Sequence, residues 1–221
     1  MDKMLKNIFA VNLGVKETER VLVFNDLITP AEVLSPFDRK RREALSNIAR
    51  RTAEVGKALC NTMYIEFPAV GAHGVEPPAE LWASAFGIEL IKELKTRGLL
   101  AKVLEKKADN SEIEACEDII RRYVSEGRKT IDAVIALSNF STSHTRFRKW
   151  LTTFFGVRYA SMPLFDEAMF QTAMTADWLK VKERTLNVIS KVSGVTTVDI
   201  KTLLGTSISF SVKGRAFQAD T

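Results

Sequence analysis

The sequence of 221 residues predicts an α/β fold with three layers, in which a mainly parallel sheet is flanked by helices and followed by an antiparallel C-terminal hairpin. Short apolar runs of strand length alternate along the chain with longer segments of helical periodicity, as is typical of parallel βαβ units. The clearest apolar run, at residues 131–137, is continuous, which indicates a central strand covered on both faces. The tail instead alternates apolar and polar residues around Gly205, as a hairpin does.

The elements follow from the same patterns in chain order. Ser35, Pro36 and Asp38 predict a helix start, with an N-cap serine, proline in the first position and a carboxylate in the first turn. The predicted elements are a strand at 21–24, a helix at 36–59, strands at 62–67 and 99–105 on either side of a helix at 77–98, a helix at 111–127 led by a capping box at Ser111, a strand at 131–137, a helix ending at Gly156, a strand at 157–162, helices at 166–174 and 177–192, and hairpin strands at 197–204 and 207–213.

The composition excludes several classes of protein. With 46% hydrophobic and 27% charged residues, the chain is neither disordered nor collagen-like. Its length allows one large domain or two small ones, and we expect a single domain over residues 1–221. No apolar run reaches the roughly 18–20 residues that span a bilayer, so we expect no membrane association. No signal peptide is visible at the start of the sequence, and Cys60 and Cys116 fit a reducing compartment as small core residues. We therefore expect a cytoplasmic protein.

The net charge of +5 is mild for a chain of this length. The densest basic run, residues 39–42, is interpreted as the solvated face of a helix whose other face carries the apolar stripe that begins at Leu45. No aromatic residues are interleaved with this run, as a stacking surface for single-stranded nucleic acid would require. Binding of nucleic acid is accordingly the weakest of the functional hypotheses.

Two loops that follow predicted strands carry more polar residues than a turn requires. Ligands of open α/β sheets bind at the carboxyl ends of the strands, where such loops lie. The candidate ligand-binding side chains of these loops are His73, Glu76, Ser143, His144, Thr145 and Arg148. A hydroxyl-rich turn at a helix N-terminus offers free backbone N–H groups to a carboxylate or a phosphate. A simple helix cap by Thr142 or Ser143 is the alternative, and the two interpretations are compatible.

The sequence contains no complete catalytic constellation. It has two histidines and no metal-binding motif, so a catalytic zinc site would need both histidines and a carboxylate such as Glu76 or Asp26 to converge. A nucleophile elbow and a phosphate-binding loop are also missing. We therefore assign no catalytic residue and no metal ligand.

Several short motifs recur in the order in which a known family has them. They lie at residues 73–78, 132–137, 143–145, 158–163, 169–170, 210–215 and 219–221. Together they resemble the N-terminal part of the aminopeptidase T family, also described as thermophilic metalloprotease-like or leucyl aminopeptidases, over nearly the whole chain. The resemblance implies a hydrolase with zinc or cobalt, whose metal ligands lie in a C-terminal half that follows a segment like 219–221. It also suggests a homodimer.

Three hypotheses result. In the first, the chain is the N-terminal, cleft-forming domain of a metallo-aminopeptidase-like protein, inactive without the metal-binding half, and its six candidate side chains face a peptide or amino-acid-like ligand. In the second, it is a stand-alone, non-catalytic module that binds a peptide or a small molecule. The third is the nucleic-acid-binding domain already mentioned.

Overall fold

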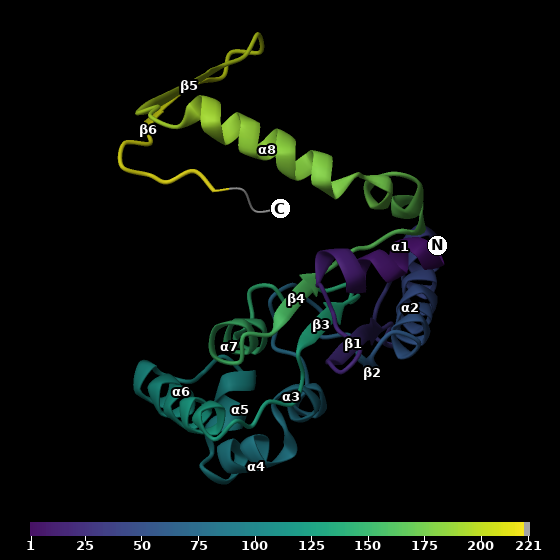
Figure 1. The fold of residues 1–221 in the computed structure, drawn as a ribbon. Helices are drawn as coiled ribbons and strands as arrows, with labels where there is room; N and C mark the ends of the chain where they lie inside the picture. The colour runs from purple at the N-terminus through teal and green to yellow at the C-terminus, as the bar shows by residue number, and fades with distance from the viewer. Residues whose placement is uncertain (219–221) are drawn as a thin grey trace. The chain divides into compact units, whose positions relative to one another are not determined.

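The computed structural model describes residues 1–218, and the chain divides into two compact units, residues 1–171 and the residues from 172 onward (Figure 1). The single domain predicted over residues 1–221 stays a prediction. The first unit contains the parallel sheet and the hydrophobic core, and the described part of the second contains a short 3-10 helix, an α-helix and a hairpin. The motif at 219–221 lies outside the described residues.

The sheet of the first unit has four parallel strands, which confirms the predicted fold class. They are β1 (Arg20–Leu27), β2 (Asn61–Pro68), β3 (Ala133–Ala136) and β4 (Arg158–Ser161), in the order β2-β1-β3-β4. Leu22 of β1 lies opposite Met63 and Val134. β1 and β3 occupy the middle of the sheet, and residues 133–136 are fully buried, as their continuous apolar run predicted.

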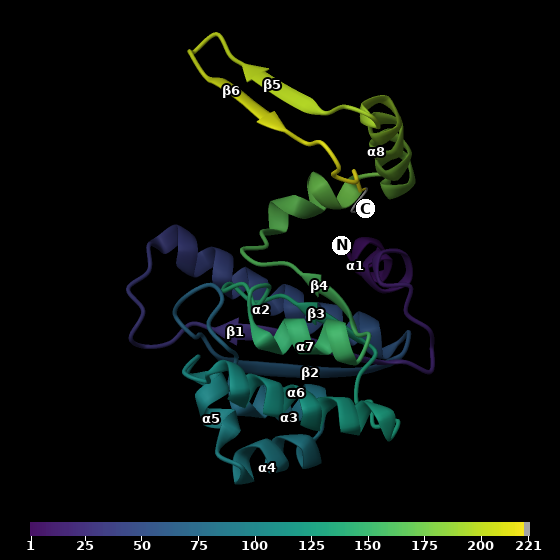
Figure 2. The same cartoon turned by 90° about the vertical axis from the view of Figure 1, so that its left-hand side faces the viewer.

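Helices cover both faces of this sheet (Figures 1 and 2). One face carries α1 (Asp2–Asn7), the short π-helix η1 (Ile8–Asn12) and α2 (Pro36–Lys57). The other face carries α3 (Ala79–Phe86), α4 (Ile88–Thr96), α5 (Leu99–Leu104), α6 (Asn110–Ser125) and α7 (Arg146–Phe154). The short 3-10 helix η2 (Glu167–Gln171) ends the unit. On the second face, Leu22 and Phe24 of β1 pack with Trp82, Phe147 and Trp150. Burial of these large side chains supplies most of the hydrophobic stabilisation of the unit.

The start of α2 is as predicted. The Ser35 hydroxyl accepts the Asp38 N–H at 3.1 Å, and Pro36 occupies the first helical position, where its missing N–H costs nothing. The capping box of α6 is also present, but its N-cap is Asp109 and not Ser111. The carboxylate two residues earlier is the better acceptor for the Glu112 N–H, at 2.9 Å.

Several predicted elements are wrong in type or length. The segment 99–105 is the helix α5 and not a strand, because Leu99, Leu100 and Val103 are buried at helical spacing. Gly87, with φ of 96°, divides the predicted helix 77–98 into α3 and α4. The segment 166–174 forms the two 3-10 helices η2 and η3 (Ala173–Thr175) instead of one α-helix.

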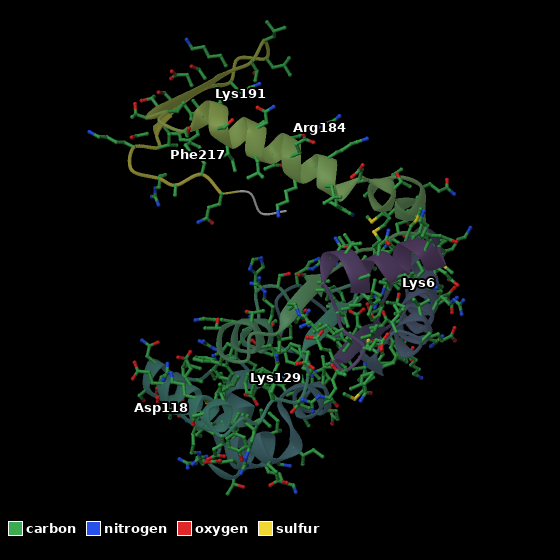
Figure 3. All side chains as sticks on the ribbon, viewed as in Figure 1. Lys6, Asp118, Lys129, Arg184, Lys191 and Phe217 are labelled. Carbon is green, nitrogen blue, oxygen red and sulfur yellow. The ribbon has the colours of Figure 1, made fainter. Side chains whose placement is uncertain are left out.

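The second unit consists of η3, α8 (Trp178–Val192) and an antiparallel hairpin of β5 (Thr197–Lys201) and β6 (Ser207–Ser211), where the sequence predicted one. None of its residues up to 218 is buried. Arg184 and Lys191 of α8, for example, are exposed (Figure 3). Within its described part this unit therefore has no core of its own. In residues 1–218, no helix has both the length and the apolar character needed to cross a bilayer.

Candidate functional site

The two loops singled out in the sequence meet at the carboxyl edge of the sheet. The Ser141 N–H donates a hydrogen bond to His73 Nδ1 at 2.9 Å, and the Gly74 N–H donates to the Ser141 carbonyl at 2.8 Å. The His73 ring also packs edge-on against Phe140, with centroids 5.7 Å apart. His73 thus joins the loop after β2 to the loop after β3.

A pocket of about 410 Å³ lies beside this junction, at the N-terminus of α7. Its lining comprises Glu76, Lys106, Ala108, Ser143, His144, Thr145, Arg146, Arg148 and Lys149. Five of the six predicted side chains are therefore brought together in one pocket. The sixth, His73, does not line it, because its ring is used to hold the two loops together.

Glu76 is the buried carboxylate of this pocket, with 5% of its surface exposed. It accepts the N–H groups of Arg146 and Phe147, at 2.6 and 3.2 Å, and so caps α7 from a loop seventy residues earlier in the chain. Burial raises the pKa of Glu76, against the opposing effect of these two hydrogen bonds. Its role in the described structure is to complete the helix end.

Thr145 is the N-cap of α7. Its hydroxyl accepts the Arg148 N–H at 3.1 Å and donates to the Thr142 carbonyl at 2.6 Å. Together, Thr145 and Glu76 occupy the first three N–H groups of the helix. The expected free N–H groups are thus already paired, and the cap is neither Thr142 nor Ser143. Ser143 instead donates its hydroxyl hydrogen to Ser161 Oγ at 2.9 Å.

Cationic side chains dominate what remains of the pocket. Lys106, Arg146, Arg148 and Lys149 line it, and within residues 1–218 none of the four forms an ion pair. Lys106 comes from the turn after α5. It is not among the side chains that the sequence predicted for this site. Of the described lining residues, Glu76 alone carries a negative charge, and that charge faces the helix N–H groups. The pocket therefore favours an anionic ligand.

The zinc or cobalt implied by the family resemblance does not fit the described residues. No three side chains of the metal-ligating types His, Cys, Asp and Glu come close enough together within residues 1–218 to hold a metal ion. His73 Nδ1 and both Glu76 oxygens already accept hydrogen bonds. Burial also raises the pKa of the Cys116 thiol to about 11, which keeps it protonated and inert. We derive no chemical step that involves a metal.

The charged groups at the start of α2 depart from their predicted role. Arg39 and Lys40 are exposed, as a solvated face requires, but Arg42 is buried, with 3% of its surface exposed. A signal for this was present in the sequence, because Arg42 lies three residues before Leu45 and seven before Ala49 and so continues the buried stripe. Asp26, at the end of β1, is buried beside it and was weighed only as a metal ligand.

Comparison of the chain with protein-family models, with curated proteins and with solved structures gives no match. We therefore infer function from the geometry of the first unit.

Proposed function

We propose that the first unit binds a small anionic ligand of peptide or amino-acid type, and that the carboxylate of this ligand lies in the pocket at the start of α7. The proposal rests on four cationic side chains that form no ion pair within residues 1–218. They surround the Glu76 carboxylate, which already accepts two N–H groups of α7. A guanidinium pairs a carboxylate with two parallel hydrogen bonds, and Arg148 is the exposed guanidinium of the group.

The size and lining of the pocket support a small ligand. A volume of about 410 Å³ lies within the range of small-molecule sites. Ser143 and His144 add further hydrogen-bonding groups next to the cations, suited to the amide or amino end of the same molecule. This assignment matches the second hypothesis from the sequence, a binding module without chemistry of its own.

The metallo-aminopeptidase hypothesis extends this proposal and stays a prediction. In it, the pocket would hold part of a peptide substrate, while zinc or cobalt would be bound by residues outside those described. Metal analysis of the purified protein, together with an assay for amino acids released from peptides, tests this extension separately from ligand binding.

Calorimetric titration with an N-acetyl amino acid tests the binding proposal, and the corresponding amide, which lacks the negative charge, is the matched ligand. We expect the acid to bind and the amide not to bind. Arg148→Gln should weaken binding about tenfold or more, since a hydrogen bond to a charged group contributes about 1.5–3 kcal/mol. His144→Ala should weaken binding and leave the fold intact, because His144 is exposed.

The chain offers a matched pair of lysines as a control. Lys106 lines the pocket, whereas its neighbour Lys107 lies outside it and pairs with Glu105 at 2.7 Å. Lys106→Gln should weaken binding of the acid, and Lys107→Gln should leave it unchanged. Equal binding of acid and amide, or equal effects of the two lysine variants, would contradict the proposal.

A further inference from the structure

A second group of buried charges lies at the carboxyl ends of β1 and β3, the two central strands, from which the chain continues to opposite edges of the sheet. From β1 the chain passes through α2 to β2, and from β3 it passes through α7 to β4 on the other side. Ligands of open parallel sheets bind outside the carboxyl ends of the strands at this point, between β1 and β3. Here Asp26, at the end of β1, accepts the N–H groups of Asn139 and Phe140 at 2.5 and 3.1 Å. The two strand ends are thereby tied together, below the first turns of α2.

Two arginines of α2 enter this region with donors that are not paired. Arg42 has a side chain only 2% exposed and pairs through Nη1 with Glu32, but its Nε and Nη2 have no hydrogen-bond partner within residues 1–218. Arg41, with a side chain 10% exposed, donates from Nη2 to Asn139 Oδ1 at 2.5 Å, while its buried Nη1 has no partner among the same residues. Burial of unpaired guanidinium donors is costly, so a fold that keeps them needs an acceptor for them.

A nearby pocket is lined by Glu32, the partner of Arg42, although neither Arg41 nor Arg42 lines it. It has a volume of about 560 Å³ and lies between the loop after β1 and α2. Two of its lining residues are direct partners of the buried polar groups: Glu32 pairs with Arg42, and Ser46 accepts a hydrogen bond from Asn25 Nδ2 at 2.9 Å. Arg39 adds a further positive charge to the wall. Glu32 is therefore the lining residue that connects the pocket with the Arg42 guanidinium.

Glu32 is held through both of its carboxylate oxygens. Its Oε1 accepts the Thr29 N–H at 2.7 Å, and its Oε2 faces Arg42. Burial raises the pKa of Glu32, but the hydrogen bonds from Arg42 and Thr29 outweigh it and lower the pKa overall, so the side chain is a carboxylate at neutral pH. The Arg42 guanidinium also lies over the Phe140 ring, 5.6 Å from its centroid, within the range of a cation–π contact.

We propose that this pocket is a second ligand site, specific for a small carboxylate, in which the ligand displaces the Glu32 carboxylate from Arg42. The incoming carboxylate pairs with Nη2 and a neighbouring nitrogen of the guanidinium, in the bidentate geometry that a single Glu32 oxygen does not achieve. Glu32 and its loop move outward in the process. The site is separate from the α7 pocket, and its ligand need not be the same.

The test compares two substitutions that remove the same charge from one pocket. Glu32 contacts Arg42, whereas Glu43 lines the pocket as an exposed side chain without an ion pair to a described residue. Acetate is the probe, inorganic phosphate is the comparison anion, and binding is followed through the backbone amide resonances of Asn139 and Phe140. E32Q should bind acetate about tenfold more tightly than the wild type. The Glu32 carboxylate competes with acetate for Arg42, and if it occupies Arg42 about nine-tenths of the time, its removal raises the apparent affinity by this factor.

The matched variant E43Q should change the affinity for acetate by less than about twofold, as loss of a screened, exposed charge does. R42K keeps the charge that pairs with Glu32 but lacks the remaining guanidinium donors, so it should fold and lose acetate binding. Arg148→Gln, in the α7 pocket, should leave these shifts unchanged, which separates this proposal from the proposed function. Equal affinities of E32Q and E43Q, phosphate bound as tightly as acetate, or acetate binding retained in R42K would each overturn the carboxylate site.

Discussion

Replacement of Glu76 tests how the start of α7 is built. Its carboxylate accepts the Arg146 N–H at 2.6 Å and the Phe147 N–H at 3.2 Å, in a buried setting. Glu76→Ala leaves both donors without an acceptor, and each hydrogen bond to a charged group contributes about 1.5–3 kcal/mol. Removal of a buried carboxylate offsets part of this loss, because its desolvation was unfavourable. We therefore expect the free energy of unfolding to fall by about 2–3 kcal/mol, above the usual cost of about 1 kcal/mol for a lost helix cap.

Urea denaturation followed by tryptophan fluorescence measures this change, since Trp82 and Trp150 are fully buried in the core of the same unit. Glu76→Gln keeps one acceptor oxygen and should give an intermediate loss. Glu114→Ala is the control, because Glu114 is exposed on α6 and forms no ion pair with the described residues, so it should change the free energy by less than about 0.5 kcal/mol. A loss for Glu76→Ala as small as that of the control would refute the assignment of Glu76 as the cap of α7.

Three further predictions concern stability and dynamics. Burial raises the pKa of Asp26 despite hydrogen bonds from two backbone N–H groups, so its contribution to stability is fully present below its unfolded pKa of about 3.9 and is lost as pH rises through the folded pKa. Other carboxyl groups titrate in both proteins, so the decline should appear as a fall in the Tm of the wild type relative to that of Asp26→Asn as pH rises, and a difference in Tm that does not change with pH would contradict it. Arg158→Met should lower the free energy of unfolding by about 1–3 kcal/mol, measured in urea, because Arg158 binds the carbonyls of Leu13 and Gly14 at 2.6 and 2.9 Å; a loss equal to that of an exposed arginine would contradict this. Amide hydrogens of α8 and the hairpin should exchange faster than those of β1 and β3, because no described residue of the second unit is buried, and equal protection would show that this unit is covered.

Much of the fold could be predicted because the decisive signals are local. The apolar run at 131–137 and the residues around Ser35 determine their elements through neighbours in the sequence. The run at 99–105 was misassigned because a short apolar segment fits either period, and only packing against the other helices shows that it is helical. Local patterns also do not reveal that, among residues 1–218, the buried core lies within residues 1–171.

The candidate site was predictable in its residues but not in its chemistry. The two loops stood out by composition, and the rule for open sheets placed them at one edge. The use of Glu76 as a cap depends on a contact across seventy residues, and the inclusion of Lys106 depends on where α5 ends. The burial of Arg42 similarly follows from packing at the sheet edge, although its position on the apolar stripe indicated it.

The most direct test of the central claim is to locate the bound ligand on the protein. In a titration of isotope-labelled protein with an N-acetyl amino acid, the backbone amide resonances of residues 143–149 and of Lys106 should shift together and saturably, and the corresponding amide should not reproduce the shifts. Saturable shifts confined to other parts of the chain, or no shifts when the acid is present at millimolar concentration, would contradict the proposal that this pocket binds a carboxylate.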